Sequence, residues 1–281
     1  MVKIIVDSTC DIPAEWKEHY EVETLPLVVT LDGKDYKDGV EIQIDTLYKY
    51  MREGVFPKTS QVPPELIYEA FEAHLQRGED FIYLAFSSEL SGTCQLAVMV
   101  ANELREKYPN RRMAVVDSKG GSLATGLIAS RAYELAAQGA SFEELIEEMN
   151  RMIGRVEHLF TISSLEWLAK GGRISKPLGY AGDVLNIKPI LDVENGKMVV
   201  IKMVRGRKKA LKYLVSKIVE RAQNYPDQVI ALAHADDLET VETLQDMIHE
   251  FLPECRTVIC EIGCVLGTHL GIGGVGAFFF R

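Results

Sequence analysis

Short apolar runs alternate with longer helical segments through the first half of the chain. The runs contain the β-branched and aromatic residues that strands prefer, while helix starts are marked by Pro63-Pro64 and by the capping box Ser141–Glu144. Strands separated by helices imply a mostly parallel sheet with both faces covered. The sequence therefore predicts an α/β fold, with strands at 3–6, 81–86 and 113–116 and helices at 64–76, 90–107 and 123–137.

The second half predicts an antiparallel hairpin. Glu194-Asn195-Gly196-Lys197 lies between the strand-like runs 189–193 and 198–203, and Asn-Gly is a strong signal for a two-residue turn. A hairpin beside helix-linked strands indicates a mixed sheet. We place a boundary near Gly154, which gives an N-terminal α/β lobe at 1–154 and a C-terminal α/β lobe at 155–281. The lobes are expected to pack on one another, with a binding site between them.

The charge balance limits the partners. The net charge is -10 and the isoelectric point is near 5.2, which argues against nucleic acid and against anionic membranes as bulk partners. A small local basic patch, and with it transient membrane contact, stays compatible with these values. No apolar stretch reaches the length of a membrane span, and the first residues lack the features of a signal peptide. The five irregularly spaced cysteines predict reduced side chains, so a cytoplasmic location is expected.

Two clusters of hydroxyl side chains lie in predicted loops. Thr59-Ser60-Gln61 precedes the helix start at Pro63-Pro64, and Ser87–Thr93 follows the buried strand 81–86. Helix capping is one explanation, and an anion site is the other, because free N–H groups and the helix dipole favour negative charge there. Ligands of open α/β sheets bind at the carboxyl ends of strands. The candidate binding residues are Thr59, Ser60, Ser91, Gly92 and Thr93.

Neither cluster has the partners that catalysis requires. The serines lack a G-x-S-x-G elbow and a paired histidine, which argues against a serine hydrolase. Gly271–Gly276 matches G-x-G-x-x-G, but it lies too close to Arg281 to open the βαβ unit of a dinucleotide site. We therefore expect binding of a carboxylate without bond-making chemistry. Two alternatives stay open: an enzyme acting on a small phosphorylated or carboxylated metabolite, and a structural or regulatory module without a ligand.

Three other polar groups have simple structural explanations. Arg173, next to Gly171-Gly172, is either an exposed side chain or a guanidinium held for a phosphate or an acidic partner. The basic run at 205–209 is typical of a solvated helix start. His234-Ala235-Asp236-Asp237 resembles a metal cluster only superficially, and we expect Asp236 to cap a helix. No metal site is predicted.

Taken together, these segments resemble the DegV family, and specifically the fatty-acid-binding subunits of bacterial fatty acid kinase. The resemblance covers nearly the whole chain and keeps the order of the motifs. The motifs are Asp7-Ser8-Thr9-Cys10-Asp11, Thr59-Ser60-Gln61, Ser87–Thr93, Val116-Asp117-Ser118, Gly171–Ser175, Lys188-Pro189 and the segment around His269. Ile272 stands where the family usually has proline.

The resemblance implies a two-lobed protein whose tunnel encloses one long-chain fatty acid, such as palmitate, stearate or oleate. It implies no enzymatic activity and no cofactor of the chain's own. A separate ATP-dependent fatty acid kinase subunit would phosphorylate the bound carboxylate, and the acyl phosphate would pass to phospholipid synthesis. Carried over by motif, Thr59 and Ser91 would hydrogen-bond the carboxylate, His269 would complete that network, and Arg173 would face the kinase or the new phosphate. Ser60, Gly92 and Thr93 are expected at the same site.

Overall fold

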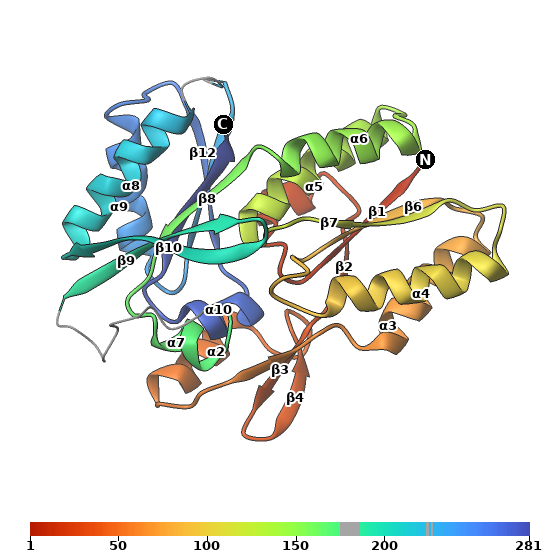
Figure 1. The fold of residues 1–281 in the computed structure, drawn as a ribbon, viewed down its shortest axis with the longest axis horizontal. Coiled ribbons are helices and arrows are strands. Elements are labelled where there is room, and N and C mark those ends of the chain that lie inside the picture. Colours follow the sequence, from red (N-terminus) through yellow and green to blue (C-terminus); the bar gives the residue numbers. More distant parts are fainter. Residues whose placement is uncertain (175–185, 223–224, 226) are drawn as a thin grey trace.

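The first sheet of the protein is parallel and covered by helices on both faces. The computed structural model describes residues 1–174, 186–222, 225 and 227–281. The four strands, in spatial order, are β2 (Glu23–Leu25), β1 (Lys3–Asp7), β6 (Phe81–Ala85) and β7 (Met113–Asp117). Helices α3 (Pro64–Gln76) and α4 (Thr93–Lys107) cover one face, and α5 (Ser122–Ala137) and α6 (Phe142–Ile153) cover the other (Figure 1). The predicted parallel sheet is confirmed.

The alternation of side chains along a strand explains why this sheet is buried on both faces. In β6, Phe81 and Tyr83 pack with the core under α3 and α4, whereas Ile82 and Leu84 pack with the core under α5 and α6. Successive side chains point to opposite faces, so a strand covered on both sides reads as an unbroken apolar run. The hydroxyl-rich segment 87–93 follows β6 in the chain, so it starts from the carboxyl end of a strand that is buried on both faces.

The second sheet is mixed, as predicted, and has six strands in the order β10-β9-β8-β13-β11-β12. They are β8 (Val156–Thr161), β9 (Ile187–Glu194), β10 (Lys197–Arg205), β11 (Val229–His234), β12 (Arg256–Glu261) and β13 (Val275–Phe280). Helices α8 (Arg207–Ala222) and α9 (Leu238–His249) cover one face, where Leu159 and Phe279 are buried. Phe160 and Phe278 are the sequence neighbours of Leu159 and Phe279, so they lie on the opposite face.

Strands β9 and β10 form the predicted hairpin. Asn195 (φ 51°) and Gly196 (φ 87°) both have left-handed backbone, which a type I′ turn requires at its two central positions. Both strands extend beyond the predicted runs, and their register shifts between Val200 and Lys202. The hairpin therefore reaches from α8 towards the first sheet (Figure 1).

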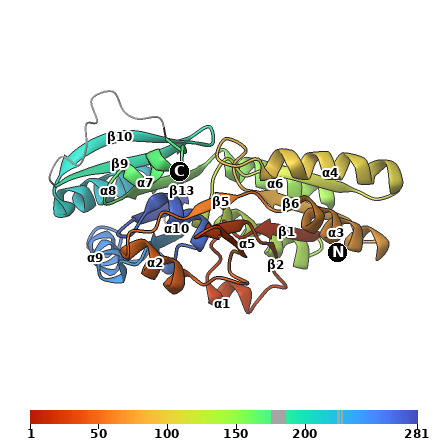
Figure 2. The same ribbon diagram turned by 90° about the horizontal axis from the view of Figure 1, so that it is seen from below.

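A third sheet is small and antiparallel. Its strand β3 (Val28–Leu31) pairs with β4 (Lys34–Lys37) and β5 (Lys58–Ser60), so Thr59, which we expected in a loop, lies in a short strand. Four short helices complete the described chain: α1 (Ala14–Lys17), α2 (Ile44–Arg52), α7 (Glu166–Lys170) and α10 (Cys264–Leu270). Although α10 is close to the C-terminus, it packs against α2, β3 and β5, and it lies near the middle of the molecule (Figure 2).

The start of α4 differs from the prediction. We expected a helix from Leu90, but α4 begins at Thr93, because the N–H groups of Leu90 and Ser91 both donate to the carbonyl of Ser87 in a separate turn. The capping box of α6 is present as predicted, with reciprocal bonds between Ser141 and Glu144. Segment 87–93 is therefore a compact turn between β6 and α4.

The predicted cap of α9 is wrong by one residue. The side chain of Asp237 accepts the cap bond from the N–H of Thr240, while Asp236 has positive φ (54°) and forms an ion pair with Arg52. All five cysteines are free thiols. Within the described ranges, none of the helices has the length and apolar character needed to cross a membrane.

Candidate functional site

A cavity lies between the second sheet, α10 and the loops that follow the strands of the first sheet. It contains about 820 Å³ of space free of protein atoms, including the space at its open mouth. Its wall is mainly apolar and comes from both halves of the chain. Representative lining residues are Leu27, Phe86, Phe160, Met198, Leu266 and Phe278.

Polar side chains gather at one end of this cavity, which we call the polar end. Thr59, Ser60, Ser91, Arg173 and His269 all line it, although they come from four separate segments of the chain. Ser60 is exposed and Thr59, Ser91 and Arg173 are partly exposed, so the polar end is near the surface. The structure thus brings together five of the seven residues selected from the sequence.

Thr59 and His269 form the central contact of the polar end. Thr59 Oγ1 lies 2.7 Å from His269 Nε2, and the imidazole is 7% exposed. Burial, reinforced by the positive charge of Arg173, lowers the pKa of His269 to about 4, so the ring is neutral at pH 7. The other nitrogen, Nδ1, has no hydrogen-bond partner among the described residues. It faces Gly171, where a Cβ would lie only 2.1 Å away.

One of the two neutral tautomers of His269 leaves Thr59 able to bind an anion. Gly171 lies against Nδ1 and Thr59 occupies Nε2, so we expect a ligand to contact the hydroxyl of Thr59 and not the ring. If Nε2 carries the ring proton, it donates to Thr59 Oγ1 and leaves the Thr59 hydroxyl proton free for an acceptor. A carboxylate is an acceptor of this kind.

Ser91 lines the cavity, whereas its neighbours Gly92 and Thr93 lie behind it. The Ser91 hydroxyl is 3.0 Å from Thr93 Oγ1 and also accepts from the Thr93 N–H at 3.3 Å. Thr93 Oγ1 in turn accepts from the N–H of Val62 at 3.3 Å. A Cβ at Gly92 would lie 2.4 Å from the Gln61 side chain. Gly92 and Thr93 therefore hold the Ser91 turn against the Thr59 segment.

Arg173 is partly exposed at the polar end, and two backbone carbonyls hold its guanidinium. Its Nε donates to the carbonyl of Leu90 at 3.1 Å, and its Nη1 donates to the carbonyl of Gly171 at 2.7 Å. Burial lowers its pKa from the ordinary value, although the group stays positively charged at neutral pH. Among the described residues that line the cavity it is the only lysine or arginine. Ser175, which belongs to the same motif, lies outside the described residues.

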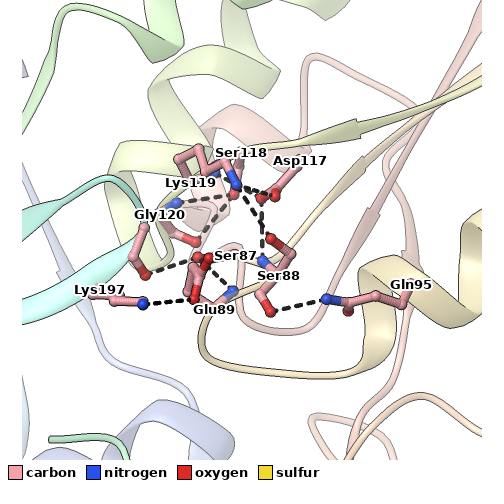
Figure 3. Close-up of polar contacts among 10 residues, drawn as sticks. Ser87, Ser88, Glu89, Gln95, Asp117, Ser118, Lys119, Gly120 and Lys197 are labelled. Carbon is pink, nitrogen blue, oxygen red and sulfur yellow. Dashed lines mark hydrogen bonds and ion pairs between the residues drawn. The ribbon is translucent and has the colours of Figure 1, made fainter.

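The other serines of segment 87–93 have structural roles. Ser87 is buried and donates to the carbonyl of Gly196 at the hairpin tip, at 2.8 Å. The N–H of Ser88 donates to Asp117, which also pairs with Lys119 at 2.7 Å, and Figure 3 shows these contacts converging. The hairpin tip is thereby attached to the turn that carries Ser91.

The basic run and the glycine motif support the loop after α10. Arg207 begins α8 and donates to Asp237 and to the carbonyl of Gly273, both at 2.7 Å, so it is not a simple solvated side chain. Gly271 and Gly273 have positive φ, and the motif runs into strand β13, which begins at Val275. A dinucleotide fingerprint would open a helix there. No group of metal-binding side chains occurs in the described part of the chain, His234 included.

Sequence reasoning missed most of the cavity wall. His158 and Phe160 line it from β8, and Val193 and Met198 line it from the hairpin strands. Their alternation with residues facing α8 was the available signal, since side chains on one face of a strand recur at every second position. The pattern alone does not reveal that this face borders a cavity.

Comparisons with known proteins agree with this architecture. A sequence model described as "Uncharacterised protein, DegV family" matches residues 1–281. A DegV domain-containing protein of Clostridium perfringens is 36% identical, with 98% of this chain and 96% of that protein covered. A protein of Thermotoga maritima named fatty acid-binding protein is 34% identical, with 98% and 96% covered.

A solved structure gives the same fold. A DegV family protein of Thermus thermophilus, described as fatty acid binding, superposes with a TM-score of 0.90 at 31% identity, covering 100% of this chain and 99% of that one. The family match extends over the whole chain, and the fold agrees over its full length. The chain belongs to the DegV family.

Proposed function

We propose that this protein binds one long-chain fatty acid in the cavity and holds its carboxylate at the polar end. The observation that carries the proposal is an apolar cavity that ends at the hydrogen-bonded pair of Thr59 and His269, with Ser91 and Arg173 beside it. The relatives from Thermotoga maritima and Thermus thermophilus, both described as fatty acid binding, support it. Residues 1–154 and 155–281 would act as two lobes that enclose the ligand.

The polar end supplies the donors that a carboxylate needs. Moving a carboxylate out of water is costly unless its oxygens are hydrogen-bonded. In this proposal Thr59 donates its hydroxyl proton to the carboxylate while it accepts from His269 Nε2, and Ser91, which also lines the cavity, donates its own hydroxyl proton. Hydrogen bonds to a charged group are the stronger kind, at about 1.5–3 kcal/mol each. The polar end thereby determines which end of the ligand faces the surface.

The apolar wall supplies affinity for the chain. Each buried CH2 group contributes about 0.8 kcal/mol, so a short carboxylate gains little from this cavity while palmitate, stearate or oleate gains much. This preference argues against the alternative of a small phosphorylated or carboxylated metabolite. No cofactor is needed for binding of this kind.

The partly exposed polar end fits a role in presentation. We infer that a separate ATP-dependent kinase subunit phosphorylates the bound carboxylate, and that the acyl phosphate is passed to phospholipid synthesis. Arg173 would face the kinase or stabilise the new phosphate, because a guanidinium pairs well with phosphate oxygens. The chain itself would bind without catalysing the transfer. A cytoplasmic protein with transient membrane contact is part of this proposal.

Native mass spectrometry of the protein purified without added lipid tests the binding step. We expect one C14–C18 fatty acid per chain, identified after denaturation. A short polar metabolite in its place would contradict the proposal, as would an empty protein that takes up no added fatty acid. Acyl-phosphate formation with a cognate kinase tests the second step, and it should fall in Thr59→Ala and Ser91→Ala proteins.

A further inference from the structure

His158 is a polar side chain in the wall of the cavity, remote from the polar end. The residue is 4% exposed and lines the cavity, and neither of its ring nitrogens has a hydrogen-bond partner among the described residues. Buried polar groups without partners are rare and costly in folded proteins. Packing alone does not explain a histidine at this position.

Strand β8 sets the distance between His158 and the polar end. His158, Phe160 and Ile162 occupy alternate positions and line the cavity, and the chain then enters α7, which packs against α10 and so lies near His269. A strand rises about 3.3 Å per residue, so His158 lies about 13 Å deeper than Ile162. In β13, Phe278 pairs with His158 at the same depth. A group that meets His158 therefore belongs to the distal half of a bound acyl chain.

The imidazole is held in place by its neighbours. Gly120 packs against the Nε2 edge, since a Cβ there would lie 2.3 Å from this nitrogen. The ring of Phe278 meets it edge-on, with 5.8 Å between centroids and 80° between planes. Burial lowers the pKa of His158 to about 4, so at pH 7 the ring has one N–H donor and one acceptor nitrogen.

A hydroxyl is the group that suits such a ring. It accepts from an N–H and donates to a bare nitrogen, so it pairs with either tautomer. A carboxylate does not suit it, because the neutral ring offers no positive charge and the negative charge of Asp192 acts at this site. We propose, building on the function proposed above, that His158 is a second polar contact in the cavity and selects fatty acids with a hydroxyl in the distal half of the chain.

The test compares three ligands on the full-length, delipidated protein. Stearate, 12-hydroxystearate and 2-hydroxystearate are titrated by isothermal calorimetry. One neutral hydrogen bond predicts that 12-hydroxystearate binds about three- to tenfold more tightly than stearate. The matched control is 2-hydroxystearate, whose hydroxyl lies beside the carboxylate and cannot reach His158, so it should show no such gain.

In the variant His158→Leu we expect the affinities of stearate and 12-hydroxystearate to be in the reverse order. A distal hydroxyl then meets an apolar side chain in place of the imidazole, so 12-hydroxystearate should bind about threefold or more weakly than stearate. Equal affinities of the wild type for these two ligands would overturn the proposal, as would an unchanged preference in the variant. The wild-type comparison stands even if the variant fails to fold. Tight stearate binding without a hydroxyl preference overturns this inference alone, whereas failure of all three ligands to bind overturns the proposed function as well.

Discussion

The substitution Thr59→Val removes one hydroxyl from the polar end while preserving the shape of the side chain. Valine keeps the β-branched form that suits β5, where Thr59 pairs with Val29 of β3. The change deletes the proposed donor to a bound carboxylate and leaves His269 Nε2 without its 2.7 Å partner. The loss of binding and the loss of stability therefore have different origins and can be measured separately.

The expected loss of affinity follows from the charge on the ligand. A hydrogen bond to a charged group is worth about 1.5–3 kcal/mol, so the Kd for stearate should rise about 10- to 150-fold. The unliganded protein should lose about 1–3 kcal/mol of unfolding free energy, since a buried imidazole nitrogen loses its partner. Calorimetric titration of delipidated protein gives the first value, and urea denaturation gives the second.

Two controls separate the hydroxyl from other effects. Thr59→Ser keeps the hydroxyl and should retain most of the affinity for stearate. Methyl stearate has the same chain but no negative charge, so Thr59→Val should weaken its binding far less. An equal loss for stearate and methyl stearate would refute the assignment of Thr59 to the carboxylate, as would full stearate affinity in the valine variant.

Three further predictions concern other parts of the structure. Arg173→Ala should leave stearate binding nearly unchanged and reduce acyl-phosphate formation with a cognate kinase. It should also raise the pKa of His269 measured by NMR, because a nearby positive charge is lost. Loss of stearate binding in the folded variant would contradict the role of Arg173 in the kinase step. Gly196→Ala should destabilise the protein by about 1–2 kcal/mol in urea denaturation, because φ is 87° and a Cβ would lie 2.6 Å from the Ser87 hydroxyl. Burial raises the pKa of Asp11 from 3.8 to about 7, so between these pH values the folded state holds a proton that the unfolded state has lost. Raising the pH from 4 to 7 should therefore lower the free energy of unfolding of the wild type by up to about 4 kcal/mol relative to that of Asp11→Asn. A difference between the two proteins that does not change with pH would count against this prediction.

Elements with a strong local pattern were predictable from the sequence. Phe81–Ala85 is an unbroken apolar run, and such a run between helix signals has few alternatives to a buried strand. Asn195-Gly196 specified the hairpin turn because both residues tolerate left-handed backbone. The local preferences of these residues agree with the conformations that the final fold requires, so long-range packing does not change them.

The elements that were wrong or missed depend on partners far away in the chain. Strand β5 has three residues, too few to show a period, and it exists because β3 pairs with it. Asp237 caps α9 in place of the predicted Asp236, whose side chain forms an ion pair with Arg52. His158 is a polar residue in an apolar strand, and only the arrangement of β13 and the loops that follow the first sheet shows that it borders a cavity.

The motif around Asp11 shows how the candidate site depends on such distant contacts. Asp11 and Asp38 are buried, and their carboxylates accept the N–H groups that begin α10: Asp11 from Gly263 at 2.9 Å, and Asp38 from Cys264 at 3.2 Å and Val265 at 3.3 Å. Helix α10 carries His269, so the N-terminal half of the chain holds both members of the Thr59–His269 pair, one through β3 and the other through two carboxylates. A carboxyl group keeps acceptor oxygens even when it is protonated, so both side chains can hold the first N–H groups of α10. A residue pattern near His269 cannot reveal this, because the groups that orient the imidazole lie at the opposite end of the sequence.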